Sequence, residues 1–387
     1  MTSLPALLRD RKVRDTVAQI AVAVALVGLL VFFVRNASEN MVKAGIASGF
    51  DFLWRQAGID VPFTLTGYTS ASSNLGLLWA GIVNTLLVSA VAIATATLLG
   101  FLIGIARLSR NPLLSGVAGA YVEFVRNIPL LFFVLIWYFG VVASLPAPRQ
   151  SISVFGIAFL NNRGLTVPLP TDTRPFGWAL LILALGIAAQ LALAAWGRRR
   201  QARTGLAFPV WRSGLALVVA LPMAAFAAAT LTAAWDVPAL RGFNYRGGFV
   251  LVPEFVALFA ALSTYTAGFI AEIVRAGILA VPGGQIEAAK AVGLTPNQTL
   301  RLVTVPQALR VMVPPMTSQY LNVIKNSSFG AAIAYPDVVS LFMGSALNNT
   351  GQAIEIIAIT LALYLSISLA VSAFMNWYNA RIALVTR

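Results

Sequence analysis

Eight windows of about 20 mostly apolar residues, separated by shorter polar segments, follow one another along the chain. A window of this length crosses the hydrocarbon core of a bilayer as an α-helix, so each window predicts a transmembrane span. The predicted spans are residues 16–34, 75–107, 129–145, 176–196, 214–235, 254–273, 311–333 and 353–378. The first span lacks a small-residue cleavage site, which favours a retained anchor over a removed signal peptide. The pattern therefore predicts an all-α polytopic protein that lies in a lipid bilayer.

The composition supports a membrane protein and excludes several kinds of chemistry. Of the 387 residues, 59% are hydrophobic and 10% are charged, whereas soluble domains carry about 25% charged residues. The sequence contains no cysteine and no histidine, which excludes disulfides, thiolate or imidazole metal ligands, and acid–base catalysis by histidine. The 13 Asp and Glu residues are scattered, so we expect no metal site, no catalytic residue and no cofactor in this chain.

The net charge of +14 is compatible with binding to nucleic acid or to an anionic surface. The basic residues, however, flank the apolar windows and form no single stripe with aromatic residues, so nucleic acid is not expected as a partner. An even number of spans places both termini on one side. If that side is the cytoplasm, the inner segments hold roughly twice as many Lys and Arg residues as the outer segments. We therefore predict cytoplasmic termini and outer loops at residues 36–74 and 146–175.

A polar loop at residues 281–306 separates two of the predicted spans. Pro282 and the glycines after it break the preceding span, and residues 285–292 contain no helix breaker. Gly293 supplies the φ > 0 position that ends a helix. Thr295 with the proline after it is typical of the N-cap of a second helix, which is predicted to run to Leu302. The sequence predicts a helix–glycine–helix knob on the cytoplasmic face.

The spacing within this loop resembles a known motif. Glu287-Ala288-Ala289, with Gly293 and Pro306 downstream, is similar to the EAA loop of ATP-binding-cassette (ABC) importer permeases. Further segments resemble the polar amino acid uptake branch of that family and occur in the family's order: residues 81–109, 121–131, 265–278 and 314–328. The long layout resembles the general L-amino-acid (glutamate/glutamine/aspartate-type) permease subunits. We call residues 281–306 the coupling loop.

This resemblance implies a type I ABC importer permease core that is interrupted by an insertion. The implied parts are residues 1–74 (an N-terminal cytoplasmic segment, an extra transmembrane helix and a periplasmic loop), 75–145 (the first part of the core), 146–252 (an insertion with a periplasmic loop and two transmembrane helices) and 253–387 (the second part of the core, with the coupling loop). The outer loops are expected to form a cap over the external mouth.

The resemblance also implies the activity, the partners and the location. The chain would be the permease subunit of an importer that moves L-amino acids into the cytoplasm by alternating access. Because no Gly-x-x-x-x-Gly-Lys-Ser/Thr motif occurs, ATP and Mg²⁺ would be bound by a separate, dimeric ATPase subunit. A second, non-identical permease subunit and a periplasmic amino acid binding protein would complete the importer, a heterodimer of permeases in the bacterial inner membrane.

The residues expected to couple the chain to the ATPase all lie in the coupling loop: Gln285, Glu287, Ala288, Ala289, Gly293 and Pro306. The two alanines would let a groove of the partner close around the helix backbone. The Glu287 carboxylate would meet basic groups of the ATPase, and the alternative is a solvated surface glutamate. Gly293 has a structural role as a turn residue under either interpretation.

Polar residues share nearly one face of the seventh predicted span, where they would line a substrate path or join helices: Ser318, Gln319, Asn322 and Lys325. Lys325 would meet a substrate carboxylate or snorkel to the outer interface, and the sequence leaves both alternatives open. No acidic residue lies on this face. Neutral and acidic amino acids are therefore expected to be taken at least as well as Arg or Lys.

The alternative function is an ion-coupled secondary amino acid transporter or a channel. Such proteins use acidic groups deep in their spans, helix breaks or internal repeats, and the sequence shows neither deep acidic residues nor a convincing repeat. Two Glu–Arg pairs at a spacing of three residues, Glu123 with Arg126 and Glu272 with Arg275, are interpreted as structural ion pairs.

Overall fold

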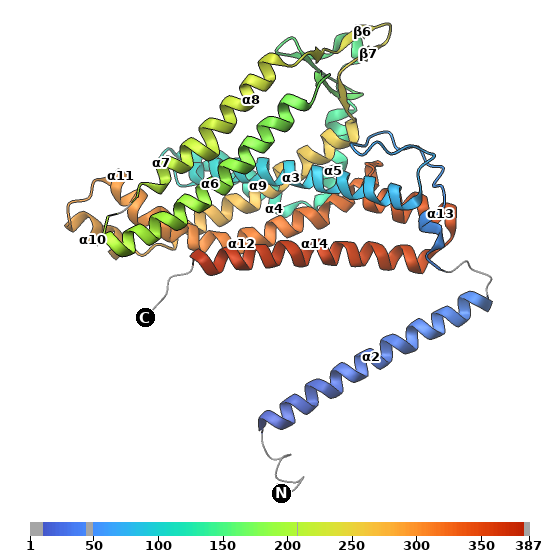
Figure 1. The fold of residues 1–387 in the computed structure, drawn as a ribbon, viewed down its shortest axis with the longest axis horizontal. Helices are drawn as coiled ribbons and strands as arrows, with labels where there is room; N and C mark the ends of the chain where they lie inside the picture. The colour runs from blue at the N-terminus through green and yellow to red at the C-terminus, as the bar shows by residue number, and fades with distance from the viewer. Residues whose placement is uncertain (1–10, 44–48, 207, 383–387) are drawn as a thin grey trace, which may run out of the picture. The chain divides into compact units, whose positions relative to one another are not determined.

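Most residues of the computed structural model are helical (Figure 1). The structure describes residues 11–43, 49–206 and 208–382. The packing divides the chain into two compact units: unit 1 combines residues 1–131 with residues 262–387, and unit 2 is residues 132–261. Two helices run across the boundaries between these segments, namely α5 (Leu130–Leu135) and α9 (Pro253–Leu279).

Unit 1 contains most of the long helices. Its elements are α2 (Arg11–Lys43), η1 (Asp51–Trp54), α3 (Asn74–Arg107), α4 (Pro112–Asn127), α10 (Gly283–Ala291), α11 (Pro296–Thr299), η5 (Leu300–Thr304), α12 (Val305–Asn326), η6 (Ser327–Ile333), η7 (Val339–Ala346), α13 (Leu347–Thr350) and α14 (Ala353–Ile382). The apolar window of α2 has none of its residues buried inside the protein. A helix that is apolar on all sides and unburied is typical of a segment surrounded by lipid.

Helices α3 and α9 approach each other closely because glycine lies at their contact. A Cβ atom added at Gly104 would lie 2.7 Å from the carbonyl oxygen of Ala271, which is too close for any side chain. A buried apolar cluster joins these two helices to α12 and to the start of the coupling loop. Its members are Ala96, Ile270, Val274, Val281, Ala308, Met312 and Met316.

Unit 2 contains a helical hairpin and short antiparallel strands. Its helical elements are η2 (Ile136–Val142), η3 (Pro148–Gln150), α6 (Arg174–Thr204), α7 (Val210–Gly214), η4 (Leu215–Ala220) and α8 (Leu221–Thr232), of which α6 and α8 pack along each other. Its strands are β1 (Ile152–Val154), β2 (Ala158–Asn161), β3 (Gly164–Val167), β4 (Leu169–Pro170), β5 (Trp235–Asp236), β6 (Ala239–Arg241), β7 (Asn244–Arg246) and β8 (Phe249–Leu251).

The strands of unit 2 come from two chain segments: β1 to β4 precede the helical hairpin, and β5 to β8 follow it. One antiparallel sheet has the order β1-β2-β3-β8, and in it Leu165 of β3 is the partner of Leu251 of β8. Two-stranded ladders pair β4 with β5 and β6 with β7. These strands were not predicted. The helices α6 to α8 lie between β3 and β8 in the sequence, so the pairing of these two strands cannot be inferred from neighbouring residues.

The predicted helical, polytopic architecture is confirmed, with a different number of spans. Among the described residues, six helices are long and apolar enough to cross a membrane, or seven if the pair Pro112–Asn127 and Leu130–Val142, bent by 109°, is one span. The predicted span at residues 129–145 is thus only the second arm of a bent pair. Ile128 has an extended conformation before Pro129, and this interrupts the helix.

The predicted span at residues 311–333 is the other difference. Its α-helix, α12, ends at Asn326 and a 3-10 segment follows. The hydroxyl groups of Ser327 and Ser328 donate back to the carbonyl oxygens of Ile324 and Lys325, each at 2.7 Å, which competes with the regular helix pattern. The polar residues of α12 also keep it outside the set of strongly apolar helices.

Candidate functional site

The first half of the coupling loop is the short helix α10, which a glycine turn ends. α10 begins after the Pro282 N-cap. Gly293 adopts φ +82°, and the N–H of Leu294 donates to the carbonyl oxygen of Ala289 at 3.1 Å, which closes the end of the helix. Gly293 is therefore the left-handed turn residue that the sequence predicts.

The second half of the loop begins with a capping box, as the sequence predicts for Thr295. The Thr295 hydroxyl accepts the N–H of Gln298 at 3.4 Å, and the Gln298 side chain accepts the N–H of Thr295 at 2.9 Å. The predicted helix end at Leu302 is wrong, because the π-helical turn η5 continues the chain into α12. Pro306 lies in the first turn of α12, where a missing N–H costs little.

The residues expected to couple the loop to an ATPase differ in their exposure. Gln285, Glu287 and Ala288 are exposed on α10. Ala289 is buried at 5% exposure, so it anchors α10 instead of facing outward. Thr299 of α11 is buried as well, and α10 packs against α11 and η5. The loop is thus a compact knob with its own small interior.

The knob exposes three large apolar side chains among its polar ones. Val292 is 76% exposed, Leu302 is 61% exposed and Leu300 is 51% exposed. Exposed apolar side chains that gather on one small element mark a contact with another protein. None of the three was predicted as a contact residue: Val292 directly precedes the glycine turn, and Leu300 and Leu302 lie in η5.

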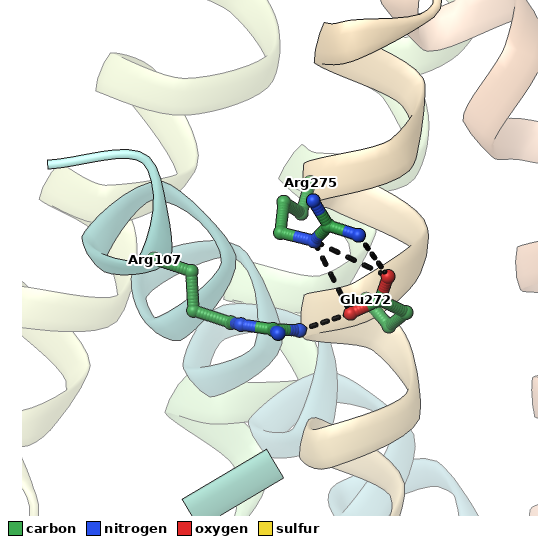
Figure 2. A network of polar contacts seen from close by, with 3 residues as sticks. All are labelled: Arg107, Glu272 and Arg275. Atoms are coloured by element: carbon green, nitrogen blue, oxygen red, sulfur yellow. Dashed lines mark hydrogen bonds and ion pairs between the residues drawn. The ribbon is translucent and has the colours of Figure 1, made fainter. Parts of the chain in front are cut away.

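An ion network lies on α9, about two turns before that helix ends. Glu272 is bound there by two arginine side chains (Figure 2). Arg275 donates to Glu272 Oε1 from Nη2 at 2.6 Å and from Nε at 3.2 Å. Arg107, in the last turn of α3, binds the other carboxylate oxygen, Oε2. The network therefore fastens the end of α3 to the helix that leads into the coupling loop.

The predicted pair of Glu272 with Arg275 is confirmed, and its third member was missed. Arg107 was interpreted only as a charge that flanks a span. Its partner lies on a different helix, so no spacing rule identifies it. The predicted pair of Glu123 with Arg126 is wrong, since it is absent from the ion pairs of the described residues. Instead, the Arg126 guanidinium lies 6.0 Å from the ring centroid of Phe269.

The residues predicted to line a path lie together on α12. Ser318, Asn322 and Lys325 are exposed on unit 1, and Gln319 is half-buried. Within the described residues, Lys325 forms no ion pair with a carboxylate. A polar stripe on a helix of a membrane protein is costly against hydrocarbon and requires protein or water in front of it.

Comparison with known proteins decides the family. Residues 96–384 match the model of the binding-protein-dependent transport system inner membrane component. The chain belongs to this family. The permease is 49% identical to the putative amino-acid ABC transporter permease protein YhdX of Escherichia coli, over 97% of this chain and 95% of that one.

Two further relatives and one solved structure resemble the permease. It is 47% identical to the general L-amino acid transport system permease protein AapQ of Rhizobium johnstonii, over 98% of this chain and 94% of that one. It is 38% identical to the glutamate/glutamine/aspartate/asparagine transport system permease protein BztB of Rhodobacter capsulatus, over 99% and 97%. A crystal structure of an amino acid ABC transporter with histidines is 20% identical, with a TM-score of 0.48, over 79% of this chain and 94% of that one.

Family membership confirms the type I ABC importer permease fold and a multi-pass protein of the inner membrane. The permease is a transport subunit and not an enzyme, because ATP hydrolysis in such transporters takes place in a separate ATPase subunit. In the described part of the permease, no group of three or more acidic residues lies close enough together to hold a metal ion.

The permease also buries two acidic side chains: Asp337 was not singled out from the sequence, and the interpretation of Glu355 as a solvated residue at the start of the last span is wrong. Asp337, between η6 and η7, is completely buried, and its Oδ1 accepts the N–H of Ser340 at 2.7 Å. Burial raises the pKa of Asp337 to about 7. Glu355, in the first turn of α14, is 8% exposed and accepts the N–H of Gly49 at 2.6 Å. Asp337 lies outside the eight predicted spans, where a search for acids within spans does not look.

Proposed function

We propose that this chain is the permease subunit of an ABC importer that carries L-amino acids into the cytoplasm, with both termini and the coupling loop inside. The observation that carries the proposal is the exposed helix–glycine–helix knob at the end of α9, in a chain without an ATP-binding motif. The names of relatives that match nearly the whole chain support amino acids as the substrate class.

The knob is suited to fit a groove of a separate ATPase subunit, which binds ATP and Mg²⁺. Val292 and Leu302 supply apolar contact area, and Glu287 supplies a charge for basic groups of the partner. Because α9 enters the loop and α12 leaves it, a push on the knob reaches two helices of the permease at once. Closure of an ATPase dimer would in this way reorient the permease between outward- and inward-open states.

The substrate path runs along the polar stripe of α12, and a second permease subunit closes it. In a single chain this stripe is exposed, and a membrane protein leaves such a surface uncovered only at a high free-energy cost. A homologous subunit that presents its own polar stripe would cover it and enclose a wet path. The relatives' names favour a broad range of polar substrates, and the lack of an acidic side chain on the stripe favours neutral and acidic amino acids.

The coupling role is tested with two glycine variants of the same loop. Gly293→Val places a β-branched side chain at φ +82°, which costs about 1–2 kcal/mol or more and distorts the knob. Gly283→Ala is the matched control, because its added Cβ has no atom within 4 Å and its φ is not positive. Both variants are reconstituted in proteoliposomes with the ATPase, the second permease and the binding protein.

We expect Gly293→Val to insert normally but to lose amino acid uptake and substrate-stimulated ATP hydrolysis, whereas Gly283→Ala behaves as the wild type. Normal stimulation of ATP hydrolysis in Gly293→Val would refute the coupling role. Uptake that follows an ion gradient and persists without the ATPase would replace the proposal by a secondary transporter.

The path is tested at Lys325. If its ammonium group meets the substrate carboxylate, Lys325→Gln should slow the uptake of Glu and Asp most, by about tenfold or more, because a charge-assisted hydrogen bond is lost. Competition between labelled Glu and unlabelled amino acids, with saturated binding protein present, measures this. Uptake that is unchanged for every amino acid would mean that Lys325 only snorkels to the interface.

A further inference from the structure

The strands of unit 2 carry an exposed apolar edge that the fold itself does not require. β1 is the edge strand of its sheet, paired with β2 on one side only. All its residues are exposed, with Ile152 at 48% and Val154 at 37%. An open strand edge with apolar side chains pairs readily with another protein segment, and proteins usually blunt such edges with charges or proline. This edge has neither.

The turn between β1 and β2 adds an exposed aromatic side chain at a strained position. Phe155 is 94% exposed and has φ +54°, and Gly156 after it has φ +74°. Turns of this kind prefer Asn, Asp or Gly at the first position, and a bulky residue there costs about 1 kcal/mol. Phe155 thus contributes nothing to burial and is unfavourable for the backbone. Such an outlier points to a role in binding.

The strand segments that flank the helical hairpin carry mostly positive charge. Of the two acidic residues that border them, Asp236 accepts the N–H of Gly248 at 2.9 Å and Asp172 accepts the N–H of Arg174 at 2.9 Å. Residues 146–171 and 237–252 contain no Asp or Glu, and their charged residues are Arg149, Arg163, Arg241 and Arg246. The first two hold the β6–β7 hairpin on the sheet: the Arg149 guanidinium lies 4.3 Å from the Phe243 ring centroid, and Arg163 donates to Asn244. Arg241 and Arg246 are exposed and form no ion pair in the described structure.

The last strand of unit 2 and the coupling loop adjoin the two ends of one helix, α9, in the sequence. β8 ends at Leu251 and α9 begins at Pro253, whereas the coupling loop follows the other end of α9. A helix of 27 residues is about 40 Å long, which is enough to cross a bilayer. If the coupling loop is cytoplasmic, the strands are therefore on the outside. The family to which the chain belongs depends on a binding protein. Under the proposed function, that protein delivers the substrate on this outer side.

We propose that β1, the turn at Phe155 and the two free arginines of the β6–β7 hairpin form the docking surface for the external binding protein. The surface fits a partner whose contact face combines acidic side chains with an apolar pocket for Phe155. A lipid surface fits less well, because headgroups and hydrocarbon leave the open backbone edge of β1 without an ordered partner. The inference rests on the proposed function, since it assumes that the coupling loop is cytoplasmic.

The test uses the complete importer in nanodiscs and titrates the purified, amino-acid-loaded binding protein. The test variants are Phe155→Ala and the double variant Arg241→Glu/Arg246→Glu. The control is Arg198→Glu/Arg199→Glu, which makes the same change of charge at the other end of α6. The half-maximal concentration of binding protein and the maximal rate of ATP hydrolysis are recorded for each, at low and high salt.

We expect both test variants to raise the half-maximal concentration by about tenfold or more, with an unchanged maximal rate at saturation. The effect of the arginine variant should shrink at high salt, and the control should match the wild type. A photo-reactive amino acid at position 155 should cross-link to the binding protein. Unchanged half-maximal concentrations would overturn the proposal, as would an effect that appears only when the nanodisc contains phosphatidylglycerol.

The two proposals fail in different ways. If the proposed transport function is wrong, the wild-type complex shows no amino acid uptake and no stimulation of ATP hydrolysis at any concentration of binding protein. If only the docking surface is wrong, the wild type works and the variants titrate identically to it.

Discussion

Glu272→Gln would keep the shape of a side chain while removing the negative charge that two arginines share. In the native network, Arg107 reaches Glu272 from α3 and Arg275 reaches it from the next turn of α9 (Figure 2). A glutamine offers one carbonyl oxygen in place of two carboxylate oxygens, and its NH₂ group faces arginine donors. The variant therefore leaves Arg107, whose side chain is only 15% exposed, without a counter-charge.

The expected cost follows from the different exposure of the two contacts. A hydrogen bond to a charged group contributes about 1.5–3 kcal/mol when it is shielded from water, and the contact of Arg107 is of this kind. Arg275 is 33% exposed and pairs within its own helix, which contributes about 0.3–0.5 kcal/mol. We expect Glu272→Gln to destabilise the permease by about 2–3 kcal/mol, nearly all of it through the bond between helices.

Thermal unfolding in nanodiscs, followed by tryptophan fluorescence, measures this. The midpoint should fall by about 5 °C for Glu272→Gln. Glu123→Gln is the matched control, because Glu123 is exposed on α4 and belongs to none of the ion pairs among the described residues. A double-mutant cycle then separates the two arginines. The coupling of Glu272 with Arg107 should be several times larger than its coupling with Arg275.

Two outcomes would refute this reasoning. Equal midpoints for Glu272→Gln and Glu123→Gln would show that the network adds no stability. A larger coupling with Arg275 than with Arg107 would show that the stabilisation is local to α9 and does not join the two helices.

Two further predictions concern pH and orientation. The folded pKa of Asp337 is raised from 3.8 to about 7, so its stabilising contribution is complete below about pH 4 and is lost as the pH rises through 7. The thermal midpoint of the wild type should fall as the pH rises from about 4 to about 7 and level off above that, and Asp337→Asn should flatten this slope; equal slopes would contradict the assignment. Of two reporters fused after Arg199, one active only in the cytoplasm and one active only outside, the cytoplasmic one alone should give a signal. A signal from the external reporter would contradict the proposed orientation of α6.

The sequence predicted best those features that depend on neighbouring residues. The turn at Gly293 and the cap at Thr295 follow from local backbone preferences, and the structure has both. The long apolar helices follow from hydropathy alone. Features that need distant segments were missed: Arg107 meets Glu272 across two helices, and β3 pairs with β8. The residues that neighbour Arg107 and β3 in the sequence do not indicate that these pair with Glu272 and β8.

The proline and serine positions show why boundaries failed even where the element was predicted correctly. Apolar composition continues through Ile128 and Pro129, but the backbone before a proline favours an extended conformation and the helix breaks there. At the end of α12 the reason is a competing hydrogen bond from Ser327, which hydropathy does not register. The roles assigned to the coupling loop and the path residues stay predictions until the variants are measured.

The π-helical turn η5 determines how far the knob is rotated about the axis of α12. In a regular α-helix each residue advances the winding by about 100°, and a π-helical turn accommodates one residue more than an α-helical turn would. Leu300–Thr304 therefore rotates the coupling loop about the axis of α12, relative to an uninterrupted α-helix. Deletion of one residue from η5 would restore regular winding and would swing the knob by about 100° while leaving its own caps and turn intact. The one extra residue in η5 thus determines the direction in which the knob faces its partner.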